Sequence, residues 1–126
     1  AHASNNLDIQ EFMIVPLSFP TYSEALRAGC EIYHILGNNL KSDGKSISVG
    51  DEGGFAPDMS SEEEALDYLV RAIEDAGYTT DEVKIALDVA SSEWVREDKY
   101  MLPKSGEILS SDSLISKLEL LQINTL

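Results

Sequence analysis

The sequence predicts an α/β fold that is incomplete in this chain, with its elements in the order strand, helix, helix, strand, helix. Two short apolar runs have the length and composition of strands, and three longer segments repeat their apolar residues at helical spacing. The second run is apolar at nearly every position, which is typical of a buried strand in a parallel sheet covered by helices. A closed eight-stranded barrel takes about 250 residues. The chain of 126 residues therefore holds at most half of such a fold.

The first strand is expected at residues 7–15, where β-formers are frequent and Pro16 ends the run. Side chains alternate between the two faces of a strand. This alternation places one carboxylate on an otherwise apolar face, which is unusual because an unpaired buried charge is costly. The residues of that face are Leu7, Ile9, Glu11 and Met13.

The first helix is expected to begin at Thr21, because Thr21 and Glu24 stand three apart as in a capping box. Cys30, the single cysteine, cannot form an internal disulfide, which is typical of a reducing compartment. Its helical spacing favours a small core residue over a nucleophile. His34 in the same helix is interpreted as a packed or surface histidine. The apolar stripe comprises Ala25, Leu26, Gly29, Ile32, Tyr33, Leu36 and Leu40.

The rest of the chain is divided by loops. A polar loop at 41–46 leads to VGDEGGFAP at 49–57, in which two acids sit among three glycines. Ser60 and Ser61 cap the second helix, which ends at Gly77. The second strand at 83–90 is followed by a polar, partly hairpin-like stretch, and Ser110, Ser111 and Asp112 start the last helix. The apolar stripes of the two helices are Ala65, Leu66, Leu69, Val70 and Ile73, and Leu114, Ile115, Leu118 and Leu121.

Composition excludes several classes of function. The chain has 23 Asp and Glu against 9 Lys and Arg, so nucleic acid is not an expected partner. No apolar run reaches the roughly 20 residues that span a bilayer. The N-terminus has no signal peptide and no initiator Met, which we interpret as a chain processed or cut from a longer protein. A net charge of -14 means that an anionic substrate needs local positive charge, from a metal or from basic residues elsewhere.

Three acids differ from the solvated ones, such as Glu62–Glu64 and Glu74–Asp75 on helix starts and polar faces. Glu11 on an apolar face is either functional or a buried, hydrogen-bonded structural acid. Glu52 lies in a solvated turn or, held close to a second acid, has the raised pKa of a general acid. Asp88 lies near the end of the second strand, where α/β folds place their functional residues. This position favours a role for Asp88 as a ligand of a hard cation such as Mg²⁺. Motifs for phosphate loops, nucleophile elbows, zinc sites and EF-hands are missing.

Read together, several segments resemble the enolase (phosphopyruvate hydratase) family. They occur in the family's order and cover roughly residues 2 to 121, and VGDEGGFAP and QEFM are highly specific. The resemblance implies that residues 1–126 are a central segment of the catalytic barrel domain, an incomplete (β/α)8 TIM barrel. The segments are HASNNLDIQEFMIVP (2–16), EALRAGCEIYHIL (24–36), VGDEGGFAP (49–57), EEALDYLVRAIEDAGY (63–78) and KIALDVASSEW (84–94).

The resemblance also implies residue roles in the reversible dehydration of 2-phosphoglycerate to phosphoenolpyruvate, a glycolytic lyase reaction. Glu52 matches the general acid that assists loss of the C3 hydroxyl, and Glu11 matches the acid paired with it. Gln10 and His2 match substrate-site residues, His2 on a mobile loop. Asp88 matches one of the carboxylates that hold the essential Mg²⁺.

Departures from the family lead to a second hypothesis. The N-terminal domain, the first barrel strand, the catalytic lysine and the other metal ligands have no counterpart in these residues, and the tail 122–126 does not continue the family's pattern. A chain of this kind is either a segment of a working enolase or a truncated, non-catalytic remnant that acts as a binding or surface-interaction protein. The family implies a homodimer or larger assembly and a cytoplasmic location, with surface or secreted forms within its range.

Overall fold

The computed structural model describes residues 3–125, with side chains as far as residue 122. Its elements confirm the predicted order strand, helix, helix, strand, helix, and add short strands in the hairpin-like stretch. The first part contains β1 (Glu11–Pro16), α1 (Tyr22–Ser42), α2 (Glu62–Asp75) and β2 (Val83–Asp88). The second part contains the 3-10 turn η1 (Ser91–Trp94), β3 (Val95–Arg96), β4 (Lys99–Met101), β5 (Ile108–Leu109) and α3 (Ser111–Thr125).

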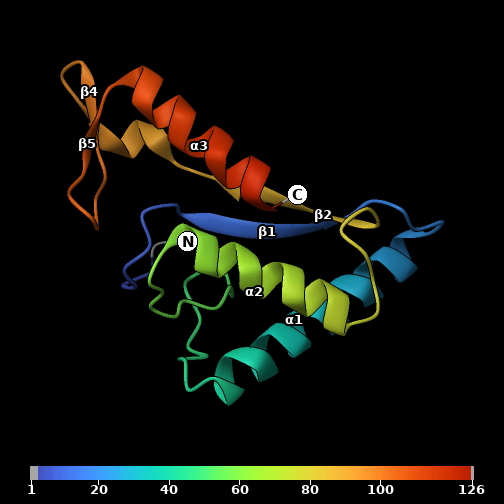
Figure 1. Cartoon of the computed structure of the whole chain (residues 1–126). Helices are drawn as coiled ribbons and strands as arrows, with labels where there is room; N and C mark the ends of the chain where they lie inside the picture. Colours follow the sequence, from blue (N-terminus) through green and yellow to red (C-terminus); the bar gives the residue numbers. More distant parts are fainter. Residues whose placement is uncertain (1–2, 126) are drawn as a thin grey trace.

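Strands β1 and β2 form a two-stranded antiparallel sheet, in which Glu11 lies opposite Asp88 and Pro16 lies opposite Val83. The expectation of a parallel sheet was therefore wrong for this pair. A nearly continuous apolar run in a strand carries no information on the direction of the neighbouring strand. The strands β3, β4 and β5 make a separate antiparallel sheet at one end of the molecule, beside α3 (Figure 1).

One face of the β1–β2 sheet carries the packing against the helices. Side chains of Phe12, Ile14, Ile85 and Leu87 point to this face, since they share the same parity in the register. They pack against three clusters of buried residues supplied largely by the helices, with Ile32 from α1, Leu66 and Ile73 from α2, and Leu114 and Leu121 from α3. Figure 1 shows α2 running alongside β1. In this view α1 lies below α2, and α3 lies above the two strands.

The opposite face of the sheet carries Glu11, Met13, Lys84, Ala86 and Asp88. Met13 is 36% exposed and the other four are half-buried. The alternation rule thus assigned Glu11 to the wrong face, because the strand begins at Glu11 and not at residue 7. Leu7 and Ile9 are buried, but in the irregular segment before the strand. Glu11 therefore stands on the more open face of the sheet.

Local capping explains where the first two helices begin and where α2 ends. Thr21 accepts a hydrogen bond from the Glu24 amide at 3.3 Å, as the capping box predicts, and the Glu24 carboxylate accepts from the Thr21 hydroxyl at 2.8 Å in place of the Thr21 amide. Ser61 caps α2 by accepting from the Glu64 amide at 3.1 Å. Gly77 follows α2 with a φ of +87°, a left-handed conformation that favours glycine.

Several surface assignments were wrong. Cys30 is exposed, because α1 turns Ala28, Ile32 and Leu40 toward the interior. Leu26 and Ile115 of the predicted stripes are also exposed. Glu62 and Glu64 are hydrogen-bonded to other segments and are more than solvated charges, as described below. Among the described residues, no helix is long and apolar enough to cross a bilayer.

Candidate active site

Glu11 and Asp88 lie on neighbouring strands at one end of the β1–β2 sheet, as directly opposed residues of the register. Opposed residues of an antiparallel pair project to the same face. The Asp88 carboxylate is held by two donors: the Ala90 amide at 3.0 Å from Oδ1, and Gln10 Nε2 at 3.5 Å from Oδ2. Three of the residues predicted to act on the substrate or metal are therefore neighbours in space.

The fourth residue, Glu52, lies at the tip of a tight backbone turn. The amide of Gly53 donates to the carbonyl of Gly50 at 3.0 Å, and the amide of Gly50 donates to the carbonyl of Gly54 at 2.8 Å. Gly53 has a φ of +84°, a conformation that a residue with a Cβ rarely adopts. The turn is closed at its base by an antiparallel bridge between Val49 and Phe55. The glycines thus permit a hairpin that presents Glu52 at its end.

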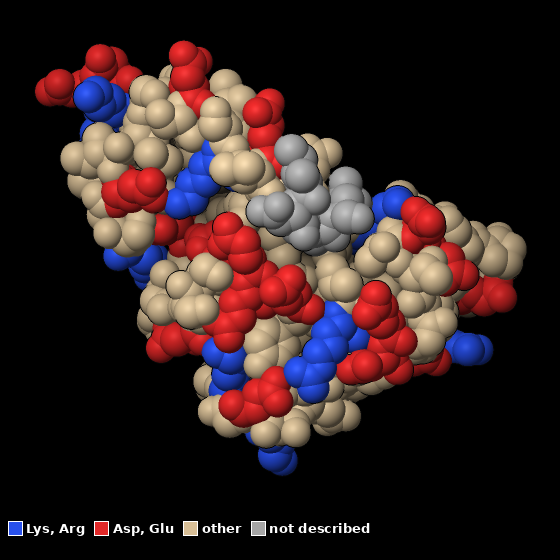
Figure 2. Space-filling view, in the orientation of Figure 1, with Lys and Arg blue, Asp and Glu red and all other residues tan. Residues whose placement is uncertain are grey.

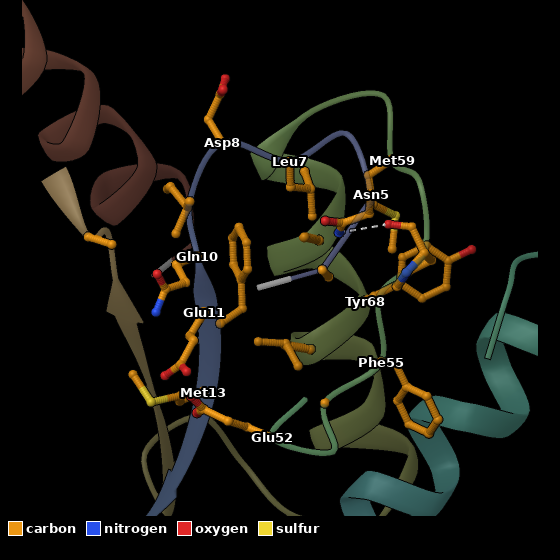
Figure 3. A pocket seen from close by; sticks show the side chains of 18 of the residues that line it. Asn5, Leu7, Asp8, Gln10, Glu11, Met13, Glu52, Phe55, Met59 and Tyr68 are labelled. Carbon is orange, nitrogen blue, oxygen red and sulfur yellow. Dashed lines mark hydrogen bonds between the residues drawn. The ribbon is translucent and has the colours of Figure 1, made fainter. Parts of the chain in front are cut away.

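This hairpin is docked on α1. The rings of Tyr33 and Phe55 stack with centroids 4.5 Å apart and planes inclined by 13°. The Tyr33 hydroxyl donates to the carbonyl of Gly53 at 2.9 Å. Phe55 also lies so close to Gly37 that a Cβ at position 37 would stand 2.8 Å from Cζ of the ring. In Figure 3, Phe55 lies beside the helix that supplies these contacts.

Glu52 meets Glu11 across the site. A side-chain hydrogen bond with Glu52 raises the pKa of Glu11, and desolvation and the nearby negative charges of Glu52 and Asp88 raise that pKa further. Two carboxyl groups make such a bond by sharing a proton, because ionised carboxylates only accept. Figure 3 shows the two side chains extending toward each other from β1 and from the glycine loop. The contact thus favours the protonated form of Glu11.

Hydrogen bonds hold the segment before β1 against neighbouring loops and the start of α2. Asn6 forms a reciprocal pair with the backbone of Met59, with Nδ2 donating to the carbonyl at 2.8 Å and Oδ1 accepting from the amide at 2.8 Å. The buried Asp8 carboxylate accepts from the amides of Lys104 and Ser105 at 2.7 and 3.1 Å. Glu62 in turn accepts from the Asp8 amide at 2.9 Å. These bonds fix the strand entry that carries Gln10 and Glu11.

A pocket of about 590 Å³ adjoins these residues, with Gln10, Glu11 and Glu52 among its lining side chains (Figure 3). Its remaining wall is mostly apolar and comes from β1 with the segment before it, the first two helices, the loop between these helices, and residues of the segments 90–94 and 103–104. Lys104 is the only Lys or Arg among the described residues that line it. The surrounding surface is acidic, and Figure 2 shows Asp and Glu side chains over much of the face that carries α2.

The candidate residues can supply only part of a metal site. Asp88 offers a carboxylate with one oxygen held loosely by Gln10, which suits a hard cation that takes few carboxylates. Across residues 3–125, however, no group of three or more His, Cys, Asp and Glu side chains is placed to hold a metal ion. Among the described residues, Asp88 can therefore offer one carboxylate to a cation, and the other acids do not complete a site.

The structure brings together Gln10, Glu11, Glu52 and Asp88, and His2 lies outside the described residues. Sequence reasoning missed two supporting residues. Tyr33 was assigned to an apolar stripe, although a packed tyrosine needs a partner for its hydroxyl, and this need is a usable signal. Asp8 carries no sequence signal, because its partners are backbone amides of a distant turn.

Comparison with known proteins identifies relatives of the whole segment. A family model described as "Enolase, C-terminal TIM barrel domain" matches residues 1–124. The chain is 50% identical over 115 residues to an enolase of a Nitratiruptor species, and 52% identical over 115 residues to an enolase of Natranaerobius thermophilus. Each match covers 90% of this chain and 27% of the relative, so the chain spans about a quarter of the length of these relatives.

Proposed function

The chain belongs to the enolase family, in the C-terminal TIM barrel domain, and on this premise we propose that it carries the acid side of an enolase active site. The reaction is the reversible dehydration of 2-phospho-D-glycerate to phosphoenolpyruvate by a Mg²⁺-dependent lyase. The observation that carries the proposal is the meeting of the Glu11 and Glu52 side chains, in which Glu52 raises the pKa of Glu11. Enolase-type chemistry needs a protonated acid beside a leaving hydroxyl, and a neighbouring carboxylate favours the protonated form of a carboxyl group.

Glu52 acts as the general acid that protonates the leaving C3 hydroxyl, and Glu11 is its partner at that hydroxyl. A like charge within hydrogen-bond distance disfavours ionisation of both carboxyls together. A proton donated from this pair to the departing oxygen neutralises that oxygen as the C–O bond breaks. The position of Glu52 at the tip of a hairpin supports this role, since the tip can approach a bound substrate.

Asp88 is proposed as one ligand of Mg²⁺. When bound, the metal supplies positive charge against the extra negative charge that forms when the proton next to the substrate carboxylate is removed. Gln10 orients Asp88 through its amide and also faces the pocket, which supports a role in substrate binding. His2 is proposed to close on the substrate. The base and the further metal ligands belong to parts of the family's barrel that these residues do not include.

The proposal extends to the setting of the whole protein. A net charge of -14 leaves an anionic substrate dependent on local positive charge, which the metal provides. We place the protein in the cytoplasm as a homodimer or larger assembly, with no nucleic acid as partner. These statements rest on the family.

A second candidate is a non-catalytic remnant that acts through binding or surface interactions. The open face of the β1–β2 sheet favours it, because a two-stranded sheet with one uncovered face is poorly stable by itself and is prone to association. A Mg²⁺-dependent assay of 2-phosphoglycerate dehydration separates the two, applied to the 126-residue chain and to a full-length barrel protein that contains it. Turnover by the 126-residue chain would contradict the remnant hypothesis. Absence of turnover by the full-length protein would contradict the enzyme proposal.

A further inference from the structure

We infer that Tyr33 and Gly37 of α1 are positioning residues, which set the place of the Glu52 carboxyl by fixing the hairpin that carries it. The inference rests on the proposed role of Glu52 as the general acid. Tyr33 lines the pocket, but its ring is stacked on Phe55 and its hydroxyl is bonded to the Gly53 carbonyl, and Gly37 has no side chain. Both act on Glu52 through the loop.

The Tyr33 hydroxyl reaches the backbone next to the acid. It donates to the carbonyl of Gly53 at 2.9 Å, and Gly53 follows Glu52 directly. That carbonyl belongs to the left-handed glycine that closes the turn, so its orientation is coupled to the direction in which Glu52 leaves the backbone. Loss of this bond frees the turn to rotate while the ring stack remains.

Gly37 sets the depth at which the hairpin docks. A Cβ at position 37 would lie 2.8, 3.4 and 3.6 Å from three ring atoms of Phe55. The ring cannot swing aside cheaply, because its other face is stacked on Tyr33 at 4.5 Å and its backbone is bridged to Val49. Any side chain at position 37 therefore pushes the base of the hairpin away from α1, and Glu52 at the tip moves with it.

The two acids are held by different elements. Glu11 is held by β1 and its pairing with β2, while Glu52 is exposed and its hairpin makes aromatic contacts with α1. A shift of the hairpin consequently changes the separation of the two carboxyls without moving the backbone that carries Glu11, Gln10 and Asp88. The expected defect is in proton delivery to the leaving hydroxyl and not in substrate or metal binding.

The test uses a full-length barrel protein that contains this chain, with Gly37→Ala and Tyr33→Phe, and two readouts: elimination, and exchange of the C2 proton of 2-phosphoglycerate with solvent. We expect Gly37→Ala to lower kcat for elimination by about tenfold to a hundredfold, the range for a misplacement of about 1 Å. C2 exchange, which needs the base and the metal, and KM should stay within about threefold. Tyr33→Phe should lower elimination in the same selective way by a smaller factor.

Gly29→Ala is the matched control, because Gly29 is a second glycine of α1 whose added Cβ would meet only Cγ of Pro16 at 3.9 Å. It should leave both readouts unchanged. If Gly37→Ala fails to fold, Tyr33→Phe removes a single oxygen and decides the matter.

The failures of the two proposals are distinguishable. If Glu52→Gln keeps its elimination rate, the general-acid role is wrong, whatever the α1 variants do. If Glu52→Gln loses elimination, two results would overturn the positioning role alone. In the first, Tyr33→Phe and Gly37→Ala keep the wild-type elimination rate. In the second, they lose elimination and C2 exchange equally.

Discussion

Glu11 on β1 and Glu52 at the tip of the glycine hairpin bring their carboxyl groups together, and the neighbouring Glu52 raises the pKa of Glu11. The two acids reach each other from different supports. The antiparallel strand pair holds Glu11 opposite Asp88, and α1 holds the hairpin through Tyr33 and Phe55. The candidate general acid thus meets the end of the β1–β2 sheet that carries Glu11 and the candidate metal ligand Asp88.

Asp88 is predicted to govern the magnesium requirement. Asp88→Asn removes a negative charge from the proposed ligand, so the Mg²⁺ concentration for half-maximal activity of the full-length protein should rise by about tenfold to a hundredfold, as for loss of a group that supports a metal. Asp98→Asn, at an exposed position outside the site, is the control and should leave that concentration unchanged. An unaltered Mg²⁺ requirement in Asp88→Asn would count against the ligand role.

Glu64 is predicted to make stability depend on acid pH. Hydrogen bonds from the Ser60 amide at 2.6 Å and from Lys45 at 2.9 Å lower the pKa of Glu64 to about 2. The ionised Glu64 contributes to the free energy of unfolding above a pH of about 4.3, the pKa of Glu in an unfolded chain. This contribution is lost as the pH falls toward about 2. Urea unfolding of wild type and Glu64→Gln should therefore differ at neutral pH and converge near a pH of about 2. A difference that stays constant with pH would contradict this assignment.

Asp8 is predicted to hold the turn at 103–106. Its carboxylate accepts from the amides of Lys104 and Ser105, and a lost buried hydrogen-bond acceptor costs about 1–3 kcal/mol. In Asp8→Ala those two amides should exchange hydrogen with solvent about tenfold to a hundredfold faster, which mass spectrometry or NMR measures. The Leu114 amide, bonded to the Ser110 carbonyl, serves as the internal reference. Unchanged hydrogen exchange at both amides would show that Asp8 does not hold this turn.

Local chemistry made some of the fold predictable. The capping side chains Thr21 and Ser61 and the left-handed Gly77 act within one turn of the chain, so their roles could be inferred from spacing. The direction of the β1–β2 pair and the exposed side of Cys30 depend on which elements cover which surface. Such tertiary choices are not encoded in the periodicity of a single segment.

The same distinction applies to the candidate site. Glu52 was conspicuous because glycines around an acid are unusual, and the family motifs assigned its role. Its distance from Glu11 could not be predicted, because that distance depends on the stack of Tyr33 on Phe55 and on the space beside Gly37. The face occupied by Glu11 was predicted wrongly, since strand β1 begins at Glu11 and the apolar pattern begins at Leu7.

The measurement that tests the account most directly separates the two proton transfers in a full-length barrel protein carrying Glu52→Gln. The general acid acts on the leaving hydroxyl and a different group removes the C2 proton, so the variant should lose elimination by about a hundredfold or more. It should still exchange the C2 proton of 2-phosphoglycerate with deuterium from solvent, within about threefold of the wild-type rate. Asp51→Asn, the neighbouring exposed acid, should retain both activities. Equal loss of exchange and elimination, or wild-type elimination, in Glu52→Gln would contradict the assignment of Glu52 as the general acid.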